Sequence, residues 1–425
     1  MTAALPSGAA GFLARYAALR DLLPGDPALR DAAAEAFRTA GLPGATQGRR
    51  PEAWKYTTLR PLADARFQST AEDTNGGVPP AAMTALLARA PTLDAPRLVF
   101  VNGAYRADLS TPPALFARFA DQPDFGTLTW PDREPLVALN TMLAADGALL
   151  DVLDDTDAGV VELVHLSTDG TAAHPRHCIR LGTNARLTLL DVAIGDGSYL
   201  HNPVTEVHVA AGATLTHARL QDESDRAYHL ATTYAGVAGD ATYDSFTLTL
   251  GGRVGRNEMH ALLAAPRATA HLNAAQLLTG TQHADFTSVV RHDAPSCTSR
   301  QTVKNVLNGR ARGVFQGRIE VARVAQKTDG YQMNQALLLS PDAEIDSKPE
   351  LEIFADDVKC SHGATVGELD IEQLFYLKSR GIPDAEARAI LVRAFLAEAL
   401  DAVSQETVRA ALEQSVERWW ERQAA

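Results

Sequence analysis

A thiol and an imidazole lie two residues apart in the segment FADDVKCSHGAT (354–365). In extended backbone the side chains at positions i and i+2 point to the same face, so Cys360 and His362 would lie side by side. Thiolate and imidazole are soft-to-borderline ligands that suit iron or a sulfur-rich cluster. Asp356 and Asp357 could add oxygen ligands, although two adjacent acids more often form a solvated turn. The spacing is common by chance, so this pattern alone defines a candidate site of low specificity.

A second group of ligand-type side chains lies in TGTQHADFTSVVRHDAP. His283 and His292 are nine residues apart there, with Asp285 and Asp293 nearby. Such a set could hold a metal ion or exchange protons. Single polar residues in an alternating strand, however, usually face solvent or bond a turn. The structural interpretation is therefore favoured, and a metal or acid–base site is the alternative.

The chain has three cysteines, Cys178, Cys297 and Cys360. They form neither a CxxC pair nor an even set that could make a disulfide framework. Any role they have is that of single thiols. For Cys178 and Cys297 we expect buried and inert side chains.

Common catalytic motifs are absent from the sequence. It contains no phosphate loop of the GxxxxGK(S/T) type, and no GxGxxG, GxSxG or HExxH motif. The chain is therefore predicted not to hydrolyse ATP, and the signatures of dinucleotide binding, serine hydrolysis and zinc proteolysis are missing. This favours a scaffold or binding protein over an enzyme.

The composition is that of a globular protein with a large core. Of 425 residues, 46% are hydrophobic, and 39 basic against 52 acidic residues give a net charge of -13. That charge opposes the attraction expected of a nucleic-acid or anionic-membrane binder. The first twenty residues show no export signal, and the most apolar helical stretch, AILVRAFLAEAL (389–400), is too short to span a bilayer. We expect a cytoplasmic protein.

The predicted secondary structure changes along the chain from helix to strand and then back to helix. Apolar residues at helical spacing run from residue 8 to about 93, and RLVFVNGAY (97–105) then predicts a strand with a tight turn at Asn102-Gly103. Short alternating runs separated by Gly, Asp or Asn fill residues 157–358 and are typical of strands. After Gly363 the spacing becomes helical again, and Thr365 with Glu368 predicts a helix start.

A repeat within the strand-rich region indicates its architecture. At positions 185, 213, 241 and 268 an alanine follows a short turn and precedes a new strand. The steps of 28, 28 and 27 residues are typical of a β-solenoid, in which each coil buries its inner face against its neighbours. An antiparallel sandwich is the less favoured alternative. The prediction is a mainly β chain with a mostly helical region (1–155), a solenoid core (156–362) and a C-terminal helical domain (363–425).

Longer phrases connect the chain to a known family. The stretch 313–395, with its run AEIDSKPELEIFADDVKCSHGAT, closely resembles the C-terminal half of the SufB/SufD family of iron–sulfur cluster assembly proteins. CSHGATVGELD resembles the SufD branch, because SufB tends to have an acidic residue after the histidine and Thr-Ser after the Ala-Thr. RRPEAWKYTTLRPL (49–62) is similar to the SufD N-terminal signature. The resemblance covers most of the chain and is strongest from about residue 280.

The resemblance implies a fold, partners and a site. The fold is a right-handed parallel β-helix flanked by helical domains, and the partners are SufB and, through the C-terminal helices, the SufC ATPase. Cys360 and His362 match positions at the SufB interface that hold a nascent cluster or its iron, with the remaining ligands supplied by SufB. The isolated chain is expected to hold no tightly bound cofactor. Whether a flavin binds the assembled complex, and whether the chain alone forms a homodimer, stay open.

Two alternatives and one unexplained motif remain. The chain could be a SufB-like primary scaffold, although the Gly-Ala-Thr after His362 and the lack of an N-terminal cysteine motif oppose this. It could instead be a polysaccharide-active β-helix enzyme, but such enzymes are usually exported. In the segment Trp54-Lys55-Tyr56 we expect the aromatic rings to pack the N-terminal helices onto the solenoid.

Overall fold

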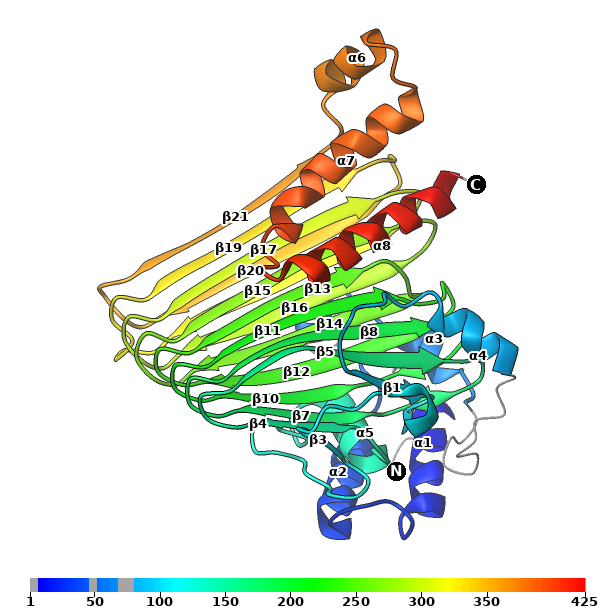
Figure 1. Ribbon diagram of the computed structural model, residues 1–425, viewed down its shortest axis with the longest axis vertical. Coiled ribbons are helices and arrows are strands. Elements are labelled where there is room, and N and C mark those ends of the chain that lie inside the picture. The colour runs from blue at the N-terminus through cyan, green and yellow to red at the C-terminus, as the bar shows by residue number, and fades with distance from the viewer. Residues whose placement is uncertain (1–6, 46–51, 68–79, 425) are drawn as a thin grey trace.

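Two parallel β-sheets form the body of the molecule (Figure 1). The computed structural model describes residues 7–45, 52–67 and 80–424, and within them one sheet has ten strands and the other eleven. The two sheets take strands alternately along the chain. Thus β11 (Thr214–Asp222) pairs with β13 (Thr242–Thr249), while β12 (Tyr228–Val237), which lies between them in sequence, pairs with β14 (Val254–Leu263) of the other sheet. This confirms the β-solenoid and excludes the antiparallel sandwich.

The ladders are parallel throughout the described solenoid, apart from β1–β2 and β3–β4 near its start. The ten-stranded sheet contains, in spatial order, β2 (Ala104–Tyr105), β1 (Arg97–Val101), β5 (Asp157–Ser167), β8 (Arg186–Gly195), β11, β13, β15 (Thr269–Leu278), β17 (Thr298–Leu307), β19 (Asp329–Leu338) and β21 (Lys359–Gly367). The eleven-stranded sheet contains β20 (Glu344–Ile353), β18 (Arg312–Val321), β16 (His283–His292), β14, β12, β10 (Val204–Val209), β7 (Arg176–Leu181), β4 (Ala148–Val152) and β3 (Phe116–Arg118). The short strand β9 (Leu200–His201) also pairs with β12, and β6 (Ala172–Ala173) pairs with β9.

The repeat seen in the sequence marks one corner of each coil. A residue with positive φ turns the chain, and the next residue, fully buried, leads into a strand of the ten-stranded sheet. The alanines at 185, 213, 241 and 268 each take this buried place. Cys297 takes it in the following coil, after Ser296 at a φ of 62°. Its thiol is therefore a core side chain, which confirms the buried interpretation, and Cys178 is buried as well.

The hairpin expected at Asn102-Gly103 is present. Asn102 and Gly103 have φ values of 50° and 85°, and they connect β1 to its antiparallel neighbour β2. Positive φ at both central residues suits the tight turn that Asn-Gly favours. Because β1 also pairs in parallel with β5, this strand is a solenoid strand that lies before residue 156, and β4 is another. At the other end β21 continues to Gly367, so the ladders extend beyond the range 156–362 on both sides.

Helices cover the outer faces of both sheets. An apolar cluster joins α1 (Ser7–Leu19), α2 (Pro27–Ala40) and α5 (Pro135–Leu143) to the outer face of the eleven-stranded sheet around β12. A second cluster joins α4 (Pro80–Leu87), α7 (Asp384–Leu400) and α8 (Glu406–Ala424) to the ten-stranded sheet. The remaining helical elements are α3 (Arg60–Ala63), α6 (Ile371–Ser379) and two 3₁₀ turns, η1 (Glu52–Trp54) and η2 (Ala107–Leu109). None of the described helices is long and apolar enough to cross a membrane.

The C-terminal helices differ in how they contact the solenoid. Helices α7 and α8 lie across the ten-stranded sheet, whereas α6 extends away from the body (Figure 1). Helix α6 begins at Ile371, because Asp370 caps it by accepting the backbone N–H groups of Glu372 and Gln373 at 2.8 and 3.1 Å. The helix start predicted at Thr365 is therefore wrong, since Thr365 still belongs to β21.

Candidate functional site

The C-terminal end of the solenoid is open. Strands β21 and β20 are the last strands of their sheets, and no further described strand pairs with their outer edges. Apolar side chains are exposed there, including Phe354 at 65% and Val366 at 55%. Exposed edge strands attract strand or surface partners. This end of the solenoid has the properties of an interface.

Cys360 and His362 lie on β21 at this open end. In the ladder Cys360 is opposite Gly330 and His362 is opposite Gln332, whose side chain is fully buried inside the solenoid. By strand alternation both residues occupy the inward face of the last coil, and the sequence had predicted that they share one face. No described coil follows to cover them, so the Cys360 side chain is half-buried and His362 is exposed.

The environment of Cys360 disfavours the charged thiolate form. Its side chain packs against the apolar cluster that contains Ile319 and Val321. Partial burial raises the pKa of the Cys360 thiol above its ordinary value. A soft metal would have to displace this proton to bind. An open depression of about 480 Å³ adjoins the thiol and is lined by Arg300, Asp329, Tyr331, Lys359, Cys360 and Ser361.

The two acids before Cys360 lie in a solvated turn, which was the more common of the two alternatives for adjacent acids. Asp356 and Asp357 are exposed and lie in a bend before β21. The backbone N–H of Asp357 donates to Gln326 Oε1 at 2.9 Å. On this strand, one thiol and one imidazole are therefore the ligands that share a face, which is an incomplete set for a metal centre.

The histidines of the segment 279–295 do not converge. His283 Nε2 lies 2.9 Å from Thr57 Oγ1, while His292 Nε2 lies 2.9 Å from Ser299 Oγ in the core. Asp285 accepts from Arg256 Nη1 at 2.5 Å. These residues fasten the N-terminal segment and the core rather than form a shared site. The expectation that they face solvent or bond a turn is wrong for Asp285 and His292, which are buried.

The Trp54 segment has the anchoring role that was expected. Trp54 is buried, and the guanidinium of Arg256 on β14 lies 4.2 Å from the centroid of its ring. Thr57, three residues later, is buried and hydrogen-bonds Asp285. Tyr56 is half-buried beside Lys55. Residues 49–51 of this phrase lie outside the described residues.

Comparisons with known proteins identify the family. Residues 164–395 match the family model described as SUF system FeS cluster assembly, SufBD core domain. The chain belongs to the SufB/SufD family. It is 36% identical to the iron–sulfur cluster assembly protein SufD of Escherichia coli, over 85% of this chain and 86% of that protein. It is 30% identical to a SufBD family protein of Synechocystis over 87% of this chain and 86% of that one, and 33% identical to the chloroplastic protein ABCI7 of Arabidopsis thaliana over 56% and 51%.

Membership of the SufB/SufD family gives the chain a role in iron–sulfur cluster assembly. The 36% identity to a SufD supports the SufD branch, which the phrase after His362 had indicated. The matched range contains Cys360 and His362.

One buried group of ligand-type side chains was missed in the sequence. His201, Glu223 and His229 lie together inside the solenoid, with ligand atoms within 4.8 Å of one another. The available signal was spacing: His201 and His229 are 28 residues apart, the same step that separates the alanines at 185 and 213. In a solenoid, residues one repeat apart stack on adjacent coils.

Cysteine accessibility gives a first prediction. Incubation of the folded chain with iodoacetamide should modify Cys360 and leave Cys178 and Cys297 unmodified, because the latter two are buried. Since the thiolate is the reactive form, the raised pKa of Cys360 means that the rate should still increase above pH 8.5, where a free cysteine is already half ionised. Mass spectrometry of peptides measures both. Equal labelling of Cys297 in the native chain would contradict the buried assignment, and Cys360→Ser is the control.

Proposed function

We propose that this chain is a scaffold subunit of the SUF system, without catalytic activity of its own, that pairs with a SufB partner through the open end of its solenoid. The observation that supports this most is the position of Cys360 and His362. They lie on the inward face of an uncovered edge strand, at the place where a second solenoid would meet this one. A partner on this edge would cover the exposed strands and could add ligands to the incomplete pair.

The pair suits a transient metal or cluster better than a permanent one. Cys360 offers one soft ligand and His362 one borderline ligand, and structural iron–sulfur sites usually have four. The chain alone is therefore expected to hold iron weakly at this place. In the complex, with ligands from SufB, iron or a nascent cluster would be held during assembly. The proposed complex is cytoplasmic.

The projecting helix is the proposed contact for the ATPase subunit, SufC. On α6 the side chains of Ile371 and Phe375 are 78% and 72% exposed and lie one turn apart on the same side of the helix, while Tyr376, 57% exposed, lies on the adjoining side. A depression of about 500 Å³ between α6 and α7 is lined by Glu372, Gln373, Tyr376, Leu377, Ile390 and Leu391. Exposed apolar residues that adjoin such a depression mark a protein-interaction surface.

The double variant Ile371→Ser with Phe375→Ser should weaken binding to SufC at least about tenfold, because apolar anchors usually dominate such contacts. The fold should be unchanged, since neither side chain is buried. Affinity is measured by calorimetry with the purified subunits. Leu22→Ser, which removes a 79% exposed leucine near α1, is the matched control. If the double variant binds SufC as tightly as this control does, α6 is not the contact.

This test uses point variants because α7 and α8 cannot be removed cleanly. Residues of both helices, such as Leu396 and Trp419, belong to the apolar cluster on the ten-stranded sheet. Lys304 of β17 also forms a 2.5 Å ion pair with Glu398 of α7. A C-terminal truncation would therefore expose the sheet. A loss of SufC binding could then result from misfolding rather than from removal of the contact.

A further inference from the structure

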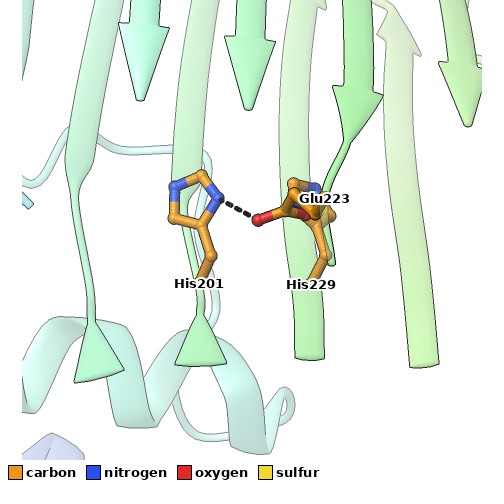
Figure 2. A group of neighbouring side chains, drawn as sticks. All are labelled: His201, Glu223 and His229. Carbon is orange, nitrogen blue, oxygen red and sulfur yellow. Dashed lines mark ion pairs between the residues drawn. The ribbon is translucent and has the colours of Figure 1, made fainter. Parts of the chain in front are cut away.

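Two histidines and a glutamate meet inside the solenoid, far from the open end (Figure 2). Their relative exposures are 2% for His201, 4% for Glu223 and 5% for His229. His201 ends the short strand β9, His229 is the second residue of β12, and Glu223 follows the last residue of β11. Figure 2 shows the two imidazoles on neighbouring strands and the carboxylate between them.

The strand pattern places both histidines on the inner face. Tyr228 and Leu230, on either side of His229, belong to the apolar cluster with the N-terminal helices and so face outward. By alternation His229 faces inward. His201 is its direct neighbour in the parallel ladder. Small residues flank the two histidines in the same row, Ala173 beside His201 and Gly255 beside His229. The ring of His165 packs against His201 with the centroids 4.9 Å apart.

Several polar atoms of this group have no hydrogen-bond partner although they are buried. They include both ring nitrogens of His201 and Oε1 of Glu223. No Lys or Arg in the described parts of the chain forms an ion pair with Glu223, whose ion-pair partners are the two histidines. Buried polar groups are nearly always satisfied, and a buried carboxylate needs a compensating charge. With both imidazoles neutral, the group therefore lacks a compensating cation.

We propose that His201, Glu223 and His229 bind one divalent transition-metal ion in the solenoid interior. Two imidazoles and one carboxylate are the protein ligands of many zinc(II) and non-haem iron(II) sites. Ligand atoms about 2.1 Å from a shared metal lie about 3.0–3.4 Å apart. Glu223 Oε2 is 2.7 Å from His229 Nδ1 and Oε1 is 3.7 Å from His201 Nδ1, so each of these two distances is within 0.5 Å of that range. All the ligand atoms lie within 4.8 Å of one another.

The surroundings have room and balanced charge. A cavity of about 20 Å³ is lined by both histidines but not by Glu223, and a space of that size holds about one water molecule or ion. Asp191 and Arg219 also line it, and they pair with each other at 4.0 Å, so the Asp191 charge is already compensated. Gln221 Nε2 donates to Glu223 Oε2 at 3.1 Å and holds the carboxylate in place.

This site does not depend on Cys360 and His362. Strand β11, which precedes Glu223, is five ladder steps from β21 in the ten-stranded sheet. At about 4.8 Å per strand, that separation is roughly 24 Å. The inference therefore stands whether or not the chain acts as the scaffold proposed above.

Metal content of the full-length chain tests the proposal. The purified protein is stripped with a chelator, incubated with zinc(II) or, without oxygen, with iron(II), and desalted, and the retained metal is measured by mass spectrometry. We expect about one equivalent of either metal in the wild type and in the double variant Cys360→Ser with His362→Ala. Glu223→Gln and His201→Gln should retain at least tenfold less. The matched control His292→Gln replaces another buried histidine and should retain the wild-type amount.

X-ray absorption spectroscopy of the zinc-loaded wild type identifies the atoms bound to zinc. It therefore tests the proposal even if a variant misfolds. We expect nitrogen and oxygen neighbours at about 2.0–2.1 Å, with imidazole scattering and no sulfur near 2.3 Å. Three results would overturn the proposal: no metal retained by the wild type, a sulfur neighbour in the zinc shell, or full retention by folded Glu223→Gln and His201→Gln. The first of these would leave the group as a buried histidine–carboxylate ion pair.

Discussion

Replacing Arg256 with methionine should lower the free energy of unfolding by about 3–5 kcal/mol, the usual cost of removing one partner from a buried ion pair. Arg256 is 1% exposed, with Nη1 2.5 Å from Asp285 Oδ2 and Nη2 2.9 Å from Glu258 Oε2. Without it, two buried carboxylates lose their shared cation. Trp54 also loses the guanidinium against its ring, so the N-terminal segment should loosen as well. Chemical denaturation followed by circular dichroism measures the change.

The pH dependence of this loss follows from Glu258. Burial alone would raise the pKa of Glu258, but the Arg256 charge, with a contribution from His260, lowers it to about 2. A carboxyl with a depressed folded pKa stabilises the fold above its unfolded pKa of about 4.3, and that stability is lost as the pH falls towards 2. The variant lacks this stabilisation, so its deficit should be larger at pH 7 than at pH 4.

A surface pair provides the control for Arg256. Arg267 and Asp240 also bridge two coils, but their side chains are 64% and 55% exposed. Arg267→Met should cost less than about 1 kcal/mol, because exposed ion pairs contribute little. Equal losses in the two variants would show that Arg256 does not hold the N-terminal segment to the solenoid in the way described.

The repeating part of the fold could be predicted from the sequence because its signals are local. A positive-φ turn followed by a buried small residue recurs in successive central coils, so the alanines at 185, 213, 241 and 268 revealed both the strands and their stacking. The Asn102-Gly103 hairpin is equally local. The start of α6 was predicted five residues too early. Both Thr365 and Asp370 can cap a helix, but Thr365 pairs with β19 in the β21 ladder, so the helix can begin only after Asp370.

Contacts between distant segments could not be predicted in the same way. No local pattern indicated that Trp54 would lie over Arg256, about two hundred residues later, or that Thr57 would bond Asp285. His201 and His229 are recognisable as a stacked pair only once the repeat is assigned to coils and the inward face is known. Glu223 breaks the repeat spacing entirely and reaches the histidines from the other sheet. By contrast, Cys360 and His362 needed only strand alternation and the family resemblance.

The largest functional effect is expected at the open end. In the assembled complex, His362→Ala and Cys360→Ser should each lower cluster yield about tenfold or more, because even outer-shell changes at metal sites cost 10- to 100-fold in affinity. Folding should change little. His362 is exposed, so its removal leaves no buried group unsatisfied, and serine keeps the shape of Cys360 while removing its soft sulfur. Ser361→Ala is the matched control, since Ser361 lies between the two residues but points to the other face of β21.

The most direct test of the proposed function is the iron and acid-labile sulfide content of the complex purified with SufB and SufC, for wild type, Cys360→Ser, His362→Ala and Ser361→Ala. The melting temperature and subunit stoichiometry are measured on the same preparations. We predict wild-type iron and sulfide in Ser361→Ala and a loss of about tenfold in the other two, with stoichiometry and melting temperature unchanged in all. Unchanged iron and sulfide in both Cys360→Ser and His362→Ala, or a loss that only follows a lower melting temperature, would contradict the assignment.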